Sequence, residues 1–362
     1  MTKKIVAGVL MLAVVFVAGC SVFGTSDDAV SKPKIAVILP FTGDAGSYGE
    51  MTKQGIEIAA KEFGYAGEVI YEDSKCDPKD SVNAMTKLVS VDKVQAVIGD
   101  LCSSATRASY PIAEQYKVVL VSPASTNPDI SKDGGYMFRT IPSDSLQGAF
   151  GAKLVYDKGY RNLAVLYSNE DYGIGFNTVL KENFEKLGGK VVASEGVERT
   201  ATDARTQITK IKAANPDAVY FIHNGPSVAA GILRQMSELG LKAFIVGSEG
   251  LRGEAILKGA GVSAEGMYVT SVASGTSAFL EQFKTIYTNV EVGPFAAQGY
   301  DAFKAIALTI KDGAKTGEEI KEALYKVEFD GGTGHVKFDA NGDVPGTYDV
   351  FVVKNGKFEL VK

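Results

Sequence analysis

The stretch VQAVIGDLCSSAT, residues 94–106, decides the fold because it joins a buried strand to the start of a helix. It is apolar up to Gly99-Asp100, where a cysteine and two serines follow, and helical spacing of apolar residues continues to residue 115. A short apolar run of this kind beside a helix is typical of a parallel sheet buried on both faces. A thiol and two hydroxyls at the end of such a strand could serve as a nucleophile, a metal ligand or an anion site.

The same alternation of strand and helix extends in both directions from this stretch. Strands are predicted at KIAVILPF (34–41), EVIYEDS (68–74), VQAVIGD (94–100) and KVVLVSP (117–123), with helices between them. The alternation restarts after residue 142 with NLAVLYSN (162–169), KVVASEGV (190–197), AVYFIHN (218–224), KAFIVGSE (242–249) and GMYVTSV (266–272). Helices then follow near 277–289, 298–311 and 316–327, and Asn355-Gly356 predicts a final hairpin. The sequence therefore predicts two successive arrays of parallel strands and helices.

The N-terminus is typical of a secretory signal and not of the fold. Lys3 and Lys4 precede an apolar run over 5–17, which is shorter than the ~20 residues of a membrane span. The run leads into VAGC, which resembles the lipobox of bacterial lipoproteins and implies cleavage before Cys20 and acylation of its thiol. An uncleaved anchor and an ordinary signal peptide are the alternatives. Residues 21–33 are expected to form a flexible tether.

The composition excludes several classes of function. The formal net charge of the 362-residue chain is -5, so a nucleic acid is not expected as a partner. The chain contains two histidines, and no zinc-ligand spacing, dinucleotide fingerprint, phosphate-binding GK[ST] loop or nucleophile elbow is present. We therefore expect no catalytic residues, no metal and no cofactor.

Cys76 and Cys102 are the two cysteines that remain if Cys20 is lipidated. In an exported protein an even pair most simply forms a disulfide, worth ~3.5 kcal/mol for a loop of this length. The alternative is a catalytic thiol at Cys102. That role needs a histidine partner, and neither His223 nor His335 lies in a recognisable motif.

The loops after the predicted strands hold the candidate binding residues. Hydroxyls gather after two strands expected to be neighbours: Ser103, Ser104, Ser122, Ser125 and Thr126. Together with free backbone N–H groups at helix N-termini they suit an anion such as a carboxylate, although simple helix capping is the alternative. Glu249 follows a strand of the second array, where it could pair with a cation or be an ordinary surface carboxylate. The two features together suit a zwitterion.

These residues lie in sequence segments that resemble those of the leucine/isoleucine/valine-binding protein family, the class I solute-binding proteins of ABC importers. The segments occur in the family's order from residue 34 onward: KIAVILPFTGDAGSYGE, DSKCDPKDSV, VIGDLCSSAT, SPASTNP, DYGIG, ILRQMSELGL and GSEG. CDPK followed by LCSS is the most specific pair, because the family carries a disulfide there. The resemblance therefore implies a Cys76–Cys102 disulfide, with the serines facing the ligand.

The resemblance also implies the fold, an α/β protein of two doubly wound parallel-sheet lobes joined by a three-strand hinge. The implied organisation is a lipoprotein signal peptide over 1–20, a tether over 21–33, a first lobe from 34–140 plus 275–327, and a second from 141–274 plus 328–362. The ligand is expected in the cleft between the lobes, which close around it.

The resemblance implies a role for each of eight residues. Ser103, Ala124 and Thr126 surround the main-chain atoms of an amino acid, Glu249 pairs with its ammonium group, and Tyr48, Tyr172 and Phe295 lie near its side chain. The eighth residue departs from the pattern: Asn224 stands where branched-chain binders have an aromatic residue. A polar ligand side chain would suit this asparagine.

The implied function is that of a monomeric, lipid-anchored receptor on the extracytoplasmic face of a membrane. It captures an amino acid, branched-chain or small and polar, and delivers it to the permease subunits of an ABC transporter. Three alternatives stay open: a binding protein for amides or urea, a chemosensory partner that reports its ligand to a receptor or kinase, and an exported enzyme.

Overall fold

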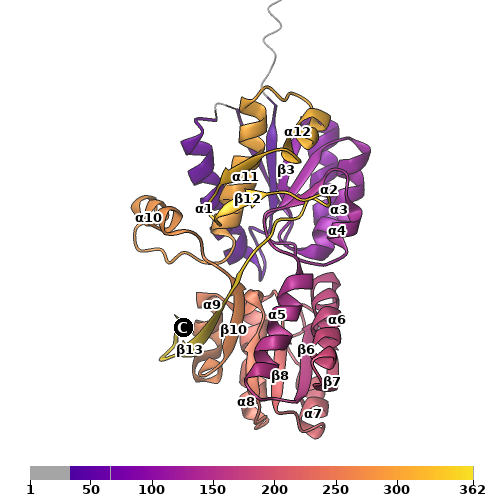
Figure 1. Cartoon of the computed structure of the whole chain (residues 1–362), viewed down its shortest axis with the longest axis vertical. Coiled ribbons are helices and arrows are strands. Elements are labelled where there is room, and N and C mark those ends of the chain that lie inside the picture. The colour runs from indigo at the N-terminus through magenta and orange to yellow at the C-terminus, as the bar shows by residue number, and fades with distance from the viewer. Residues whose placement is uncertain (1–32, 66, 362) are drawn as a thin grey trace, which may run out of the picture. The chain divides into compact units, whose positions relative to one another are not determined.

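The structure, a computed structural model, describes residues 33–65 and 67–361. The predicted signal peptide, Cys20 and nearly all of the predicted tether lie outside these residues. The described chain forms two lobes, each built on its own sheet, which lie above and below the middle of the view in Figure 1. Within these residues, no helix has the length and apolar character that a membrane crossing requires.

The first lobe contains a five-stranded parallel sheet in the order β2-β1-β3-β4-β5. Its elements are β1 (Ile35–Leu39), α1 (Gly46–Glu62), β2 (Val69–Asp73), α2 (Pro78–Lys87), the π-helical turn η1 (Leu88–Asp92), β3 (Ala96–Gly99), α3 (Ser103–Gln115), β4 (Val119–Ser122), α4 (Ile130–Asp133) and β5 (Met137–Arg139). Later segments complete it: α10 (Ser277–Ile286), α11 (Ala296–Lys311), α12 (Gly317–Leu324) and the ribbon of β11 (Glu328–Asp330) and β12 (His335–Lys337).

The second lobe contains a seven-stranded sheet in the order β14-β13-β10-β9-β8-β6-β7. Its elements are α5 (Asp144–Asp157), β6 (Asn162–Ser168), α6 (Asp171–Lys186), β7 (Lys190–Val197), α7 (Arg205–Ala213), β8 (Ala218–Ile222), α8 (Pro226–Glu238), β9 (Phe244–Gly247), the 3-10 turns η2 (Glu249–Leu251) and η3 (Gly261–Ala264), α9 (Glu254–Ala260), β10 (Tyr268–Val272), β13 (Tyr348–Lys354) and β14 (Lys357–Leu360). Five of its strands are parallel, and β13 and β14 add an antiparallel hairpin.

The two sheets share one topology. Taken in chain order within each lobe, the parallel strands of both follow the order 2-1-3-4-5. The prediction of two successive parallel arrays is therefore confirmed, and the strand order places the loops after β1, β3 and β4 at one edge of the first sheet. The central strands β1, β3, β4 and β8 are buried along their whole length, which explains why their sequences are continuous apolar runs.

The chain passes between the lobes three times, over 140–143, 273–276 and 338–347. Three connections were predicted, but these segments have no strand structure, because each leaves one sheet before it reaches the other and has no neighbouring strand to pair with.

The lobe assignment of residues 328–362 needs a correction. Val336 and Phe338 are buried in the core of the first lobe, and the chain enters the second sheet only with β13. Phe338 packs on Phe138 of β5 with ring centroids 5.2 Å apart, and Phe329 of β11 lies beside Lys304 of α11, so this segment belongs to the first core.

The disulfide predicted between Cys76 and Cys102 is present, with the two Cα atoms 5.4 Å apart. It ties the loop after β2 to the N-terminus of α3. Cys102 is therefore a structural residue and not a thiol nucleophile, which settles the question raised by the VQAVIGDLCSSAT stretch.

Close packing of α1 on α11 also shapes the region between the lobes. A Cβ atom at Gly55 would lie 1.8 Å from the carbonyl oxygen of Ala296, so only glycine allows the two helices to approach so closely. This packing brings Tyr48, near the start of α1, against Phe295, which directly precedes α11. The two rings meet edge to face with centroids 5.6 Å apart.

Candidate functional site

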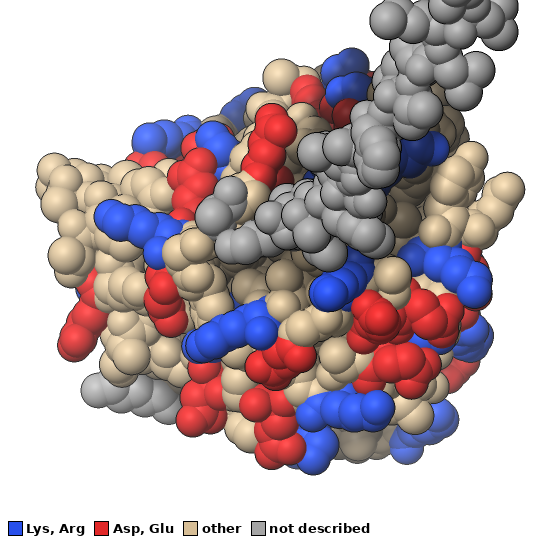
Figure 2. Space-filling view, turned by 90° about the horizontal axis from the view of Figure 1, so that it is seen from above, with Lys and Arg blue, Asp and Glu red and all other residues tan. Residues whose placement is uncertain are grey.

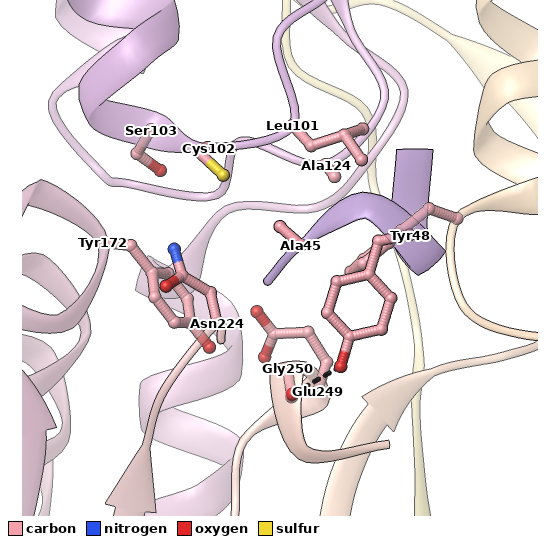
Figure 3. Close-up of a pocket in the computed structure, with 11 residues that line it drawn as sticks. Ala45, Tyr48, Leu101, Cys102, Ser103, Ala124, Tyr172, Asn224, Glu249 and Gly250 are labelled. Carbon is pink, nitrogen blue, oxygen red and sulfur yellow. Dashed lines mark hydrogen bonds between the residues drawn. The ribbon is translucent and has the colours of Figure 1, made fainter. Parts of the chain in front are cut away.

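A pocket lies between the lobes at the carboxyl ends of strands from both sheets, where ligands bind in open α/β folds. The space enclosed by its lining is about 390 Å³, a figure that includes the part open to solvent. The residues that line it are Ala45, Tyr48, Leu101, Cys102, Ser103, Ala124, Tyr172, Asn224, Glu249, Gly250 and Phe295. Seven of the eight predicted ligand-binding residues are among them, and Figure 3 shows Ser103 facing Glu249 and Asn224 across the gap.

The first-lobe wall is the N-terminus of α3. Ser103 is the first residue of this 13-residue helix, and its N-cap residue Cys102 supplies no side-chain cap. The Ser103 hydroxyl accepts a hydrogen bond from the backbone N–H of Asn127 at 3.3 Å and keeps its own hydrogen to donate. This end of the helix therefore presents donors and a positive dipole to the pocket, as an anion requires.

Ser122 and Ser125 do not line the pocket, although they lie near it in the sequence. Both hydroxyls donate to the carbonyl oxygen of Asp100, at 2.6 and 3.1 Å, and so fix the loops after β3 and β4 to one another. The predicted anion site is therefore smaller than the sequence implied, because Ser103 alone of the five hydroxyl residues lines the pocket.

Ser104 and Thr126 do not line the pocket either, and each bonds a carboxylate of the second lobe. Ser104 donates to Glu170 at 2.8 Å, and Thr126 donates to Asp144 at 2.7 Å. Thr126 is the one predicted ligand residue that does not line the pocket. It is buried, and its hydrogen is given to Asp144, so the oxygen can only accept from a third group.

Glu249 forms the charged centre of the second-lobe wall. It follows β9 in the turn η2, and only 3% of its surface is exposed. The Nε2 atom of Gln147 donates to its Oε2 at 2.6 Å. Burial raises the pKa of the Glu249 carboxyl to about 7, and burial together with the charge of Glu249 raises the pKa of the neighbouring Asp144 carboxyl. Two buried acids of this kind favour either a shared proton or a cation between them.

Asp144 and Gln147 were missed by the sequence analysis because helix α5 was missed. The segment PSDSLQG has no clear amphipathic pattern that would predict a helix. Ser143 and Asp144 resemble an ordinary capped helix start and do not by themselves indicate a binding residue. A signal was nevertheless present: Asp144 and Gln147 share a helix face with Gly148 and Gly151, small residues that permit close packing.

Asn224 follows β8 and lines the pocket, as predicted from its place in the sequence. The preceding His223 is fully buried, its Nδ1 accepts from the backbone N–H of Gly225 at 2.9 Å, and burial lowers its pKa to about 4. His223 is therefore a neutral structural residue that supports the loop bearing Asn224.

The aromatic side chains complete the wall. Tyr48 donates from its hydroxyl to the carbonyl oxygen of Gly250 at 2.8 Å, a contact that joins the lobes and is drawn in Figure 3. Tyr172 lies in the first turn of α6, where Glu170 caps the helix by accepting from its backbone N–H at 3.0 Å.

A second contact between the lobes lies beside the pocket. Asp44, in the loop after β1, accepts from the backbone N–H groups of Ser227 at 2.8 Å and Val228 at 3.2 Å. These groups belong to the first turn of α8, whose own N-cap residue Gly225 supplies no side-chain cap. The first lobe therefore supplies the cap for a helix of the second.

The visible surface and the described acids give no sign of other large charged ligands. On the part of the surface that Figure 2 leaves uncovered, lysines and arginines alternate with acidic residues and form no broad basic patch. Over 33–65 and 67–361 no cluster of three or more histidine, cysteine or acidic residues is arranged to hold a metal ion.

Comparison with known proteins identifies the family. The chain belongs to the family described as periplasmic binding protein, which matches residues 32–357. It is 33% identical to the leucine-, isoleucine-, valine-, threonine- and alanine-binding protein of Pseudomonas aeruginosa over 351 residues, 92% of each chain. The resemblance to the leucine/isoleucine/valine-binding proteins is thus confirmed.

Solved structures show the same fold. The leucine-binding protein LivK of Thermotoga maritima superposes with a TM-score of 0.85 at 31% identity, covering 91% of this chain and 98% of that one. The branched-chain amino acid binding protein LivJ of Streptococcus pneumoniae, solved with isoleucine, gives a TM-score of 0.82 at 30% identity, covering 91% and 99%. The two-lobed α/β fold and membership of a family of solute-binding proteins are therefore established.

The raised pKa of Glu249 predicts a pH dependence of stability. The folded chain holds the carboxyl proton up to about pH 7, whereas an unfolded glutamate loses it near its usual value of 4.5. The folded state therefore binds more protons between these values, and the free energy of unfolding falls as the pH rises through them. Without ligand, we expect Glu249→Gln to reduce the fall between pH 5 and pH 8 by about 1–3 kcal/mol.

Urea unfolding at a series of pH values measures this change. The matched control is Glu254→Gln, because Glu254 is exposed on α9 and paired with Lys258; it should keep the wild-type profile. Equal pH profiles for Glu249→Gln and the wild-type protein would show that the buried carboxyl keeps its ordinary pKa.

Proposed function

We propose that this protein captures a small α-amino acid between its lobes and delivers it to an ABC permease. One observation carries the proposal: a buried carboxylate on one lobe and an uncapped helix N-terminus on the other line a single small pocket. An α-amino acid carries a carboxylate and an ammonium group on one carbon, so its two charges can be paired with the two walls at once.

In the proposed complex, Ser103 and the N–H groups at the start of α3 bind the ligand carboxylate. Glu249 binds the ammonium group, whose charge favours the ionised form of this carboxyl and of Asp144. Thr126 lies outside the pocket lining and supports this wall by donating its hydrogen to Asp144. Closure of the lobes removes water from these pairs and so strengthens them.

Transport is favoured over catalysis by the chemistry of the described pocket lining. The serine hydroxyl of the pocket lining, Ser103, is the candidate for a nucleophile. No histidine or lysine is among the lining residues to take a proton from it. The relatives are named for binding leucine, isoleucine, valine, threonine and alanine, or were solved with isoleucine, which agrees with an amino acid ligand. We further propose that the protein acts as a monomer.

Glu249→Gln should weaken amino acid binding at least a hundredfold, because the amide offers no charge to the buried ammonium group. The measurement is a screen of the twenty amino acids by thermal shift, followed by titration calorimetry of each ligand that stabilises the protein. The control Glu254→Gln should bind like the wild-type protein. Undiminished affinity in Glu249→Gln would refute the proposed recognition.

The Asp44 contact predicts a link between lobe closure and affinity. Loss of a helix cap weakens a helix by about 1 kcal/mol, but the Asp44 cap forms only when the lobes meet. Asp44→Ala should therefore raise the Kd about fivefold and speed ligand release in stopped-flow measurements, although Asp44 lies outside the pocket lining.

A cap within one lobe provides the control. Asp203 accepts from the backbone N–H of Arg205 at 3.0 Å, at the start of α7. Asp203→Ala should lower the free energy of unfolding and leave the affinity unchanged. Equal losses of affinity in the two variants would argue that Asp44 acts through stability alone.

We propose that residues 1–20 act as a lipoprotein signal peptide and that the acylated Cys20 anchors the protein through the tether 21–33. Several acyl chains on one cysteine hold a protein stably at a membrane surface. In cells that express the chain, a palmitate analogue should label the wild-type protein in the membrane fraction. Cys20→Ser should abolish the label, and labelling of that variant would exclude Cys20 as the acceptor.

A further inference from the structure

The amide of Asn224 has an unusual environment for a pocket side chain. Its Oδ1 atom is buried and accepts no hydrogen bond from any residue that the structure describes. Its Nδ2 atom lies 3.5 Å from Oε1 of Glu170 and donates to it. One end of the amide is thus paired, while the other is buried and unpaired at the wall of the pocket.

Glu170 determines which end of the amide faces it. Its carboxylate already accepts from four donors, the hydroxyls of Ser104 and Ser168 and the backbone N–H groups of Tyr172 and Gly173, at 2.8 to 3.3 Å. A group that accepts so many hydrogen bonds repels another oxygen. The NH₂ group of Asn224 therefore faces Glu170, and the carbonyl oxygen is left to the pocket.

No residue of the pocket wall donates to this oxygen: the hydroxyls of Ser103 and Tyr172 also line the pocket, but neither is bonded to Oδ1 of Asn224. Leu101 and Phe295 are apolar, and the hydroxyl of Tyr48 already donates to the carbonyl oxygen of Gly250. A buried acceptor without a donor is unfavourable, so a bound molecule that brings a donor to this position gains affinity over one that does not.

We propose that the ligand side chain carries a hydrogen-bond donor that pairs with Oδ1 of Asn224, with Glu170 as the residue that orients the amide. This inference rests on the proposed function and narrows it to small amino acids whose side chain has a hydroxyl or amide N–H, such as threonine and serine. Valine has nearly the shape of threonine but no donor, so it leaves the oxygen unpaired.

Titration calorimetry of threonine and valine at pH 8, where Glu249 is ionised, tests the proposal. We expect threonine to bind the wild-type protein 10 to 100 times more tightly than valine. If valine binds as tightly as threonine, the inference is wrong while the proposed function stands. If no amino acid binds, the proposed function itself fails.

Two variants assign the preference to the residues. Asn224→Leu should abolish or reverse the preference for threonine. Glu170→Gln should reduce the ratio of the two Kd values to about threefold or less, because a glutamine can donate to Oδ1 and no longer orients the amide. The ratio is the decisive readout, since a merely structural loss would weaken both ligands equally and would exclude the orienting role.

Asn177→Leu is the matched control. Asn177 lies on α6 of the same lobe and contacts Ser194 at 3.1 Å, away from the pocket lining. It should keep the wild-type ratio. A changed ratio in this variant would mean that the preference does not arise at Asn224.

Discussion

The opposition of a buried carboxylate and a helix N-terminus across a narrow gap is the constraint on which the site depends. Glu249 is removed from water by the second lobe, and α3 of the first lobe presents its uncapped N-terminus to the same pocket. Neither group is well satisfied alone, because a buried charge requires a partner and a free helix end requires acceptors. A molecule with both charges satisfies the two groups at once, and the lobes are the means of bringing them together.

The contacts around the pocket divide into those that hold each wall and those that join the walls. The disulfide and the hydroxyls bonded to Asp100 hold the loops of the first lobe, and Gln147 holds Glu249 in the second. Asp44, Ser104 and Tyr48 reach across to the other lobe. These joining contacts are hydrogen bonds, as expected of an interface that must open.

The fold was largely predictable because its central strands are buried on both faces. Such strands are continuous apolar runs that stand out from the helices around them, so β1, β3, β4 and β8 were each found. The two successive arrays of parallel strands and the final hairpin were also predicted. Helix α5 was not found, because its inward face is polar or glycine at Asp144, Gln147, Gly148 and Gly151, and an apolar stripe is the usual signal for a helix.

The candidate site likewise contains residues that the sequence could locate and residues that it could not. Residues in short strand-end loops, such as Ser103 and Glu249, could be located from the sequence because the ends of parallel strands share one edge. The groups that support them could not, since Asp144 and Gln147 are ordinary polar residues until the tertiary structure buries them, and Glu170 until it is partly buried beside Asn224. The sequence also could not show that the hydroxyls of Ser122 and Ser125 would donate to the carbonyl oxygen of Asp100.

The triple passage of the chain between the lobes has a consequence for how the protein matures. The first lobe is closed by α10, α11 and α12, and the second sheet receives β13 and β14 only at the end of the chain. Neither lobe is a contiguous piece of polypeptide, so neither can finish its core while the last hundred residues are still being made or exported. Completion of both lobes must therefore await the arrival of the C-terminal segments, which makes folding a late and joint event for the two halves.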